Sequence, residues 1–268
     1  NVGHPTLHSW KYPLPEDSVI FRVTRIIIDL EQGSIIPLKM DPDPHRSSIT
    51  DHIASGGKLA DAEWSADSEQ LMFLSNSRDH KEVTLRLADA STGEVKTILE
   101  EKVKTFFESG YRNPNWRFLP ESNEFIWFTH QSNWGHLYLY NLETGKLKNQ
   151  ITKGDWNVHT IYKIDPKTRT IFFTGVGKEP GDPYFQYFYR VQMDGSKFSL
   201  LTPDSAHHAI QLSPNGKYFV DTWSTPQVPP VVDLRNTEYV KSKSKSKSKS
   251  NGYLRLDESD ISKLLATG

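Results

Sequence analysis

The sequence predicts an all-β protein made of repeated units, and three observations support this prediction. Aromatic residues make up 12% of the 268 residues, as 7 Trp, 11 Tyr and 13 Phe, and aromatic side chains favour strands. The 16 Gly and 16 Pro indicate short strands separated by turns. Two sequence markers also recur in phase, with a period of about 50 residues.

The first marker is a short strand, then a turn carrying Pro, Asp or Gly, then a second strand that is mostly apolar and aromatic. Its four copies are Asp61–Asp67 with Gln70–Leu74, Pro114–Pro120 with Glu124–Phe128, Ile161–Pro166 with Thr170–Thr174, and Ile210–Gly216 with Lys217–Val220. The turn residues Ala66, Pro120, Pro166 and Pro214 occupy equivalent places and follow one another at the period of the repeat.

The second marker is an alternating strand that ends in Asp or Asn and is followed by a turn glycine. Its copies are Ile26–Leu30 before Gly33, Leu85–Asp89 before Gly93, Leu137–Asn141 before Gly145, and Tyr189–Asp194 before Gly195. These glycines recur at nearly the same period as the first marker. Glycine supplies the positive φ that a hairpin reversal needs, so each copy predicts a hairpin.

A unit of about 50 residues with four short strands is the blade of a β-propeller. The sequence therefore predicts a β-propeller fragment with about four full blades and one incomplete blade, each an antiparallel sheet of three to four strands. The expected blades lie near residues 1–50 (incomplete), 51–103, 104–156, 157–205 and 206–256. The incomplete first blade predicts that the sequence begins inside a larger propeller. Residues 257–268 are expected to form a linker with a short amphipathic helix from Asp257 to Ala266.

Composition argues against several classes of protein. With 32 Lys+Arg against 33 Asp+Glu, the chain lacks the excess of positive charge that binds nucleic acid. It has no cysteine, which excludes disulfides, thiol nucleophiles and Cys-ligated zinc. Apolar runs such as Val19–Phe21 are far shorter than a membrane span, and Asn1–Trp10 has no pattern of a secretion signal. Lys241–Ser250 alternates Lys and Ser and predicts a solvated loop.

Several residues that could suggest a site have simpler structural interpretations. His207 and His208 are adjacent, so on a strand they would point to opposite faces and could not ligate one metal together; we expect a polar turn there. Asp41–His45 contains two prolines and no glycine, which favours a rigid linker over a cation loop. No metal site and no cofactor are expected. Repeated aromatics are predicted to fill the core between blades, namely Trp64, Trp116, Phe73, Trp127 and Phe172. Trp134 is expected to pack as well, although a loop Trp could also bind a partner.

Four segments resemble the propeller domain of the dipeptidyl peptidase IV family, in its bacterial form. They are Ser77–Lys81, Phe106–Tyr111, Ile151–Val158 and Leu212–Asp221. Enzymes of this family are serine exopeptidases of the prolyl oligopeptidase class, with an eight-bladed propeller and a C-terminal α/β-hydrolase domain. The resemblance implies that this chain is roughly the second half of that propeller, and that Ile261–Leu265 leads towards a hydrolase domain absent from the chain.

The resemblance also implies a function. The expected role is to shape and gate the substrate pocket of a serine-type dipeptidyl peptidase, which is periplasmic or secreted, binds a peptide substrate and can be a homodimer. No G-x-S-x-G motif occurs, so the chain supplies no nucleophile elbow and no catalytic residue, and whether it acts in an enzyme depends on the parent protein. The paired glutamates that grip the substrate amino terminus in this family lie on an earlier segment; Glu100–Glu101 does not match their context.

The best candidates for substrate binding are Tyr111 and Arg112, with Phe107 and Glu108 as neighbours. The resemblance places this segment at the entry to a blade's innermost strand, near the active site. A tyrosine offers an apolar face with a polar tip, and an arginine can hold a carbonyl or carboxylate. The simpler interpretation is that Tyr111 packs between blades and Arg112 pairs with a surface acid. For the whole chain, the alternative is a non-enzymatic propeller that serves as a protein-interaction or carbohydrate-binding platform.

Overall fold

The computed structural model of the chain describes residues 4, 6–9, 11, 14, 16–44, 54–55, 58–59, 61–108, 114–238, 253–262 and 266. The chain divides into two compact units, Asn1–Phe107 and Glu108–Gly268. In the described residues, helical structure is limited to the 3₁₀ turn Pro120–Ser122 and to Ser262. The all-β prediction is therefore confirmed.

The first unit contains one four-stranded antiparallel sheet and three two-stranded ones among its described residues. Its strands are β1 (Arg22–Val23), β2 (Ile26–Asp29), β3 (Ser34–Pro37), β4 (Asp43–Pro44), β5 (Ala54–Ser55), β6 (Lys58–Leu59), β7 (Ala62–Trp64), β8 (Gln70–Asn76), β9 (Glu82–Asp89) and β10 (Val95–Lys102). The four-stranded sheet has the order β10-β9-β8-β7, and the small pairs are β1-β4, β2-β3 and β5-β6.

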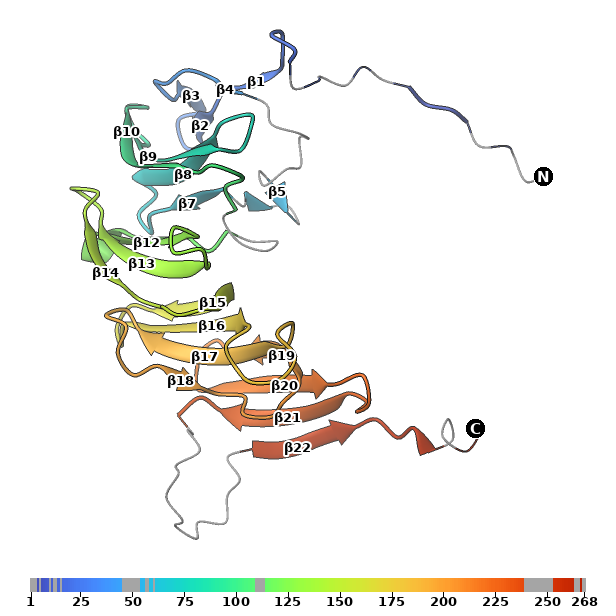
Figure 1. The fold of residues 1–268 in the computed structure, drawn as a ribbon. Helices are drawn as coiled ribbons and strands as arrows, with labels where there is room; N and C mark the ends of the chain where they lie inside the picture. Colours follow the sequence, from blue (N-terminus) through green and yellow to red (C-terminus); the bar gives the residue numbers. More distant parts are fainter. Residues whose placement is uncertain are drawn as a thin grey trace. The chain divides into compact units, whose positions relative to one another are not determined.

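The second unit contains three four-stranded antiparallel sheets, and each of them has the shape of a propeller blade (Figure 1). The first holds β11 (Arg117–Leu119), β12 (Glu124–Thr129), β13 (His136–Asn141) and β14 (Leu147–Gln150). The second holds β15 (Asn157–Asp165), β16 (Thr170–Val176), β17 (Gln186–Gln192) and β18 (Ser199–Leu200). The third holds β19 (His207–Leu212), β20 (Tyr218–Ser224), β21 (Val231–Asn236) and β22 (Tyr253–Glu258). In each sheet every strand pairs with its neighbour in the sequence.

The glycine markers occupy the hairpin turns that the sequence predicts. Gly33, Gly93, Gly145 and Gly195 have φ values of 64, 74, 64 and 84°, a region that side-chain-bearing residues rarely adopt. The Asp or Asn before each glycine stabilises the turn: the carboxylate of Asp89, for example, accepts hydrogen bonds from the backbone N–H groups of Ser91 and Thr92. The glycine and the preceding Asp or Asn together therefore determine each turn through local interactions.

Hydrophobic side chains between the sheets form the core of the second unit. One cluster joins β12 and β13 to β15, β16 and β17, and includes Trp156, Phe173 and Tyr189. A second cluster joins β16 and β17 to β19 and β20 through Phe172, Phe188, Leu201, Ile210 and Phe219. Figure 1 shows the three sheets of this unit stacked in chain order.

Most of the predicted core aromatics are buried. Trp116, Trp127, Phe73 and Phe172 expose 2, 1, 0 and 7% of their surface. Trp64 is the exception, because 47% of it is exposed on the first strand of its sheet, so its assignment to the core is wrong. Repeat position alone does not show whether a neighbouring sheet covers the side chain.

Two other predicted segments differ in the structure. Strand β22 continues to Glu258, so the helix expected from Asp257 does not begin there. Glu100 and Glu101 lie within β10 rather than after it, and Glu101 is buried. Lys241–Ser250 lies outside the described residues. No helix in the described part of the chain is long and apolar enough to cross a membrane.

Candidate functional site

The predicted substrate-binding segment is only partly described. Tyr111 and Arg112 lie outside the described residues. Phe107 ends the first unit, is 5% exposed and donates its backbone N–H to the carbonyl of His80 at 2.7 Å. Glu108 opens the second unit and is half-buried. Phe107 is thus a packed residue, and the roles of Tyr111, Arg112, Phe107 and Glu108 in substrate binding stay predictions.

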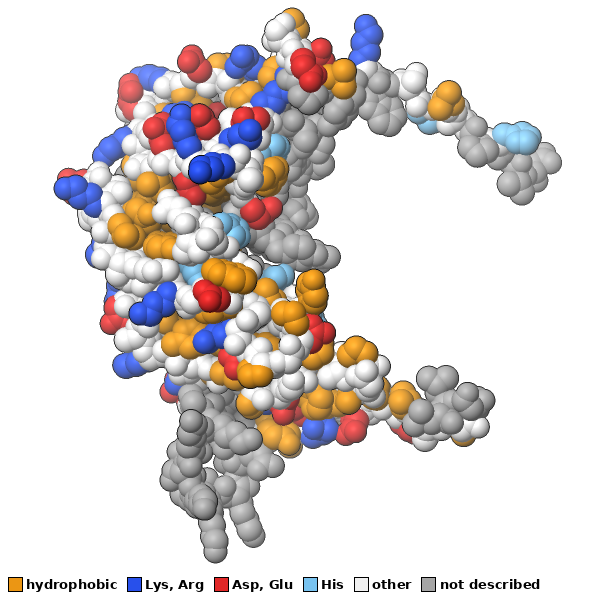
Figure 2. Space-filling model, in the orientation of Figure 1, with side chains coloured by type: hydrophobic (Ala, Val, Ile, Leu, Met, Phe, Trp, Pro, Cys, Tyr) orange, Lys and Arg blue, Asp and Glu red, His pale blue; other side chains and the backbone are white. Residues whose placement is uncertain are grey.

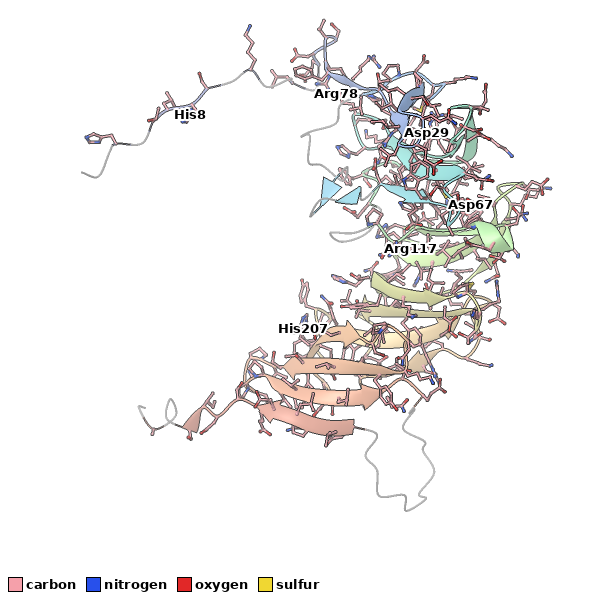
Figure 3. The ribbon with its side chains drawn as sticks, turned by 180° about the vertical axis from the view of Figure 1, so that it is seen from behind. His8, Asp29, Asp67, Arg78, Arg117 and His207 are labelled. Carbon is pink, nitrogen blue, oxygen red and sulfur yellow. The ribbon has the colours of Figure 1, made fainter. Side chains whose placement is uncertain are left out.

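In the second unit, antiparallel pairing brings a defined set of loops to one end of the sheets. We call this end the rim; it consists of residues 114–116, 130–135, 151–156, 177–185, 201–206 and 225–230. Figure 3 labels Arg117 and His207, which begin the first strands β11 and β19 at this end.

Two of the rim loops, in neighbouring repeats, share one hydrogen-bonding pattern. The hydroxyl of Thr152 accepts the backbone N–H of Leu137 at 3.0 Å, and the hydroxyl of Thr202 accepts that of Phe188 at 2.9 Å. In each case the residue before the threonine donates its backbone N–H to the same partner residue, at 2.8 Å. Each buried threonine thus anchors a loop to the third strand of the sheet that precedes it.

His136 closes the first of these loops. Its Nε2 lies 2.8 Å from the carbonyl oxygen of Gly154, and its Nδ1 lies 3.0 Å from the hydroxyl of Thr152. The carbonyl can only accept, so Nε2 carries the proton, and the threonine hydroxyl can donate to Nδ1. Burial lowers the pKa of His136, which agrees with a neutral ring. Trp156 packs edge-on to this ring, at 5.1 Å between centroids.

His207 and His208 are not in a polar turn, so that prediction is wrong. Both lie in β19; His208 is fully buried and His207 is half-buried. Their opposite orientation on the strand agrees with the argument against a shared metal. Among the described residues, no group of three or more His, Cys, Asp or Glu side chains could hold a metal ion.

Two buried histidines and an exposed aromatic ring characterise the chemistry at the described rim. Both ring nitrogens of His136 and of His208 lie within hydrogen-bond distance of neighbouring protein groups, so neither ring is available as a general base. Tyr184 is 84% exposed in the loop between β16 and β17, and the ammonium of Lys178 lies 5.7 Å from the ring of Trp156. The exposed ring of Tyr184 and the ammonium of Lys178, both on this loop, are groups of the kind that can contact a peptide or another polar ligand.

Sequence reasoning missed the polar residues buried around His208, namely Asp221, Asp233 and Arg235. One signal was present in the strand Val231–Asn236, where Val232 and Leu234 share one face and Asp233 and Arg235 share the other. The structure buries the face with the charged residues. Periodicity predicts that a strand has two unlike faces, but it assigns the apolar one to the core by default.

Comparison with known proteins identifies related sequences. The family model described as "Dipeptidyl peptidase IV (DPP IV) N-terminal region" matches residues 1–230. Dipeptidyl peptidase 4 of Arthroderma otae is 33% identical over 100 residues, and that of Trichophyton rubrum is 32% identical over 100 residues. In both cases the match covers 37% of this chain and 12% of the relative.

Solved structures show the same fold. A putative dipeptidyl aminopeptidase IV from Bacteroides ovatus superposes with a TM-score of 0.63 at 21% identity, over 84% of this chain and 36% of that one. Dipeptidyl peptidase 4 from Porphyromonas gingivalis superposes with a TM-score of 0.61 at 15% identity, over 80% of this chain and 28% of that one. The chain therefore spans about a third of the length of these proteins.

Proposed function

Because the chain belongs to the dipeptidyl peptidase IV N-terminal region family, we propose that it shapes and gates the substrate pocket of a serine-type dipeptidyl peptidase. The catalytic serine, aspartate and histidine then belong to an α/β-hydrolase domain outside this chain. The observation that carries the proposal is the family match over residues 1–230, joined to sheets that have the order of propeller blades.

Within this proposal, the segment that leads into β11 supplies the contact with peptide. Asn115, just before β11, is fully buried, and its side-chain amide is hydrogen-bonded to the backbone of β15. Arg112 would hold a peptide carbonyl or carboxylate, and Tyr111 would cover an apolar side chain, with Glu108 beside them. The bound partner is a peptide, the parent enzyme is periplasmic or secreted, and it can form a homodimer.

The test uses the full-length enzyme and a dipeptidyl substrate. Arg112→Ala should raise KM more than it lowers kcat, because it removes an interaction made equally in the ground state and the transition state. Lys153→Ala, a change at an exposed rim lysine in a different loop, is the matched control and should leave both constants unchanged. Unchanged kinetics for Arg112→Ala would refute its role in binding. The 268-residue chain by itself should not hydrolyse the substrate.

A second function rests on the exposed ring of Tyr184 at the rim. A non-enzymatic propeller could use such a ring to bind a protein or a carbohydrate. Reading the gene beyond the codon for Gly268 separates the two proposals. A G-x-S-x-G motif followed by Asp and His supports the peptidase, whereas a stop codon supports the binding platform.

A further inference from the structure

The third sheet of the second unit buries a histidine between two acceptors. His208 exposes 0% of its surface, as does Asp221. The Nδ1 atom of His208 lies 2.9 and 3.0 Å from the two carboxylate oxygens of Asp221. On the other side of the ring, Nε2 lies 3.0 Å from the backbone carbonyl oxygen of Asp204.

The protonation state of this ring follows from its partners. A backbone carbonyl has no proton to give, so Nε2 must donate. Asp221 forms an ion pair with Arg235, whose Nε lies 2.9 Å from its Oδ2 without the alignment of a hydrogen bond. A carboxylate can only accept a hydrogen bond. Nδ1 must therefore donate as well.

We propose that His208 is a buried imidazolium that acts as a pH-sensitive latch, fastening the rim loop 201–206 to the third sheet. This role is separate from the proposed peptidase function and does not depend on it. The latch is closed while both ring nitrogens carry protons, because one ring then bridges β20 and the carbonyl of Asp204.

The acidic side chains around the ring favour its cationic form. The carboxylate of Asp204 lies 2.6 Å from Arg235 Nη2, and that of Asp233 lies 3.0 Å from Arg235 Nη2 and 2.7 Å from Arg255 Nε. Four carboxylates thus face three cations: Asp204, Asp221, Asp233 and Glu258 against His208, Arg235 and Arg255. Deprotonation would remove one of the two cationic partners of the fully buried Asp221 carboxylate, which is costly in a low-dielectric site.

Two further titratable groups face the ring. Tyr187 on β17 packs against His208, with 5.6 Å between ring centroids, and its buried hydroxyl has no hydrogen-bond partner among the described residues. His207 is the adjacent residue; burial lowers its pKa, and the charge on His208 lowers it further. Neither Tyr187 nor His207 replaces Asp221 or the carbonyl of Asp204 as the partner of a ring nitrogen of His208.

His136 provides an internal comparison. It donates to the carbonyl of Gly154, which occupies the position equivalent to Asp204 in the preceding repeat. Its Nδ1 faces a threonine hydroxyl in place of a carboxylate. Equivalent loops are therefore closed by a neutral ring, His136, in one repeat and by a charged ring, His208, in the next. Only the loop closed by His208 should respond to loss of a ring proton.

The latch has a defined direction with pH. The ring holds both protons only below the pH at which the imidazolium loses one, so the latch is closed at lower pH and opens as the pH rises. A neutral ring can donate only one hydrogen bond, so either Asp221 or the carbonyl of Asp204 loses its donor. The backbone N–H of Ala206, which also bonds to that carbonyl at 2.9 Å, should then exchange faster.

The first test is the nitrogen NMR spectrum of the histidine-labelled chain at pH 7. His208, assigned by its loss in His208→Gln, should show two protonated ring nitrogens, and His136 should show one protonated and one bare nitrogen. A bare ring nitrogen in His208 at pH 7 would overturn the proposal.

The second test is hydrogen exchange from pH 6 to pH 9, corrected for the intrinsic rate. Protection of segment 201–207 should fall roughly tenfold or more, and that of segment 151–157 less than twofold. His208→Gln should remove the pH-dependent step, whereas the control His207→Gln should keep it. The latch is refuted if the two segments of the wild-type chain lose protection equally between pH 6 and pH 9. It is also refuted if segment 201–207 still loses protection with rising pH in His208→Gln. If His208→Gln fails to fold, comparison of the two segments in the wild-type chain still decides the matter.

Discussion

The carboxylate of Glu124 on β12 binds the guanidinium of Arg169, which lies just before β16 in the next sheet, at 2.8 and 3.2 Å. Lys148 on β14 contacts the same carboxylate. Glu124 exposes only 2% of its surface, so one buried acid connects two neighbouring sheets. Burial alone would raise the pKa of Glu124, but hydrogen bonds from Arg169 and Lys148 outweigh it and lower the pKa to about 2.

Glu124 should make stability depend on acid pH. Its pKa is lower in the folded chain than in the unfolded chain, so its contribution is present above about pH 4.5 and is lost as the pH falls towards 2. The full contribution is about 3 kcal/mol by linkage. Urea unfolding at pH 7, 4 and 3 should show a steeper loss for the wild type than for Glu124→Gln. The control Glu121→Gln, at an exposed acid, should follow the wild type; equal slopes for wild type and Glu124→Gln would contradict the prediction.

Asn115 should be essential for joining the first strands of two sheets. Its amide donates to the carbonyl of His159 at 3.0 Å and accepts the backbone N–H of Ile161 at 3.0 Å, and the side chain is fully buried. Asn115→Ala removes both of these buried hydrogen bonds and should lower the free energy of unfolding by about 2 to 4 kcal/mol. Asn149→Ala, which removes one half-buried hydrogen bond to the carbonyl of Met193, should cost about 1 kcal/mol. Similar urea midpoints for the two variants would show that Asn115 has no special role.

Gly175 should tolerate no side chain. A Cβ at this position would lie 2.9 Å from the indole ring of Trp156 and 3.1 Å from the backbone oxygen of Asn157. Gly175→Ala should therefore destabilise the protein by about 1 to 3 kcal/mol, as overpacking does. Trp156→Leu makes room, so the double variant should lose less stability than the sum of the two single variants. Thermal unfolding of the four proteins gives this coupling; additive losses would place the strain elsewhere.

The two tryptophans with opposite burial should behave differently. Trp127 is 1% exposed, so Trp127→Ala should cost about 3 to 5 kcal/mol. Trp64 is 47% exposed, so Trp64→Ala should cost about 1 kcal/mol or less. Denaturant unfolding followed by circular dichroism measures both. A large loss for Trp64→Ala would mean that its ring is covered in solution.

The repeats were predictable because their signals are local. A strand, an Asp or Asn and a glycine within about ten residues determine a hairpin, and the four marker glycines have the expected positive φ. The polar centre around His208 was not predictable in this way. Its partners Asp221 and Arg235 lie on other strands of the sheet and meet the ring only when those strands pair. The exposure of Trp64 likewise depends on neighbours that the repeat position does not encode.

The distribution of charged side chains on the surface agrees with the nearly balanced composition of the sequence. Figure 2 shows acidic and basic side chains mixed over the visible face, in keeping with a net charge of -1. Such a surface has no field of one sign that would attract a polyanion. Buried carboxylates such as Glu124 and Asp221 are ion-paired with arginines, and a total charge from the sequence cannot reveal such pairs.

Each four-stranded sheet takes all its strands from one continuous stretch of chain, and in the described residues none lends a hydrogen-bonded strand to the next. A genetic duplication or deletion of one such stretch would add or remove a whole module without breaking a backbone hydrogen-bond ladder. The same property predicts the response to mechanical load. Pulled from its two ends, the chain should lengthen in discrete steps of about 50 residues, as each sheet ruptures alone and its neighbours stay intact.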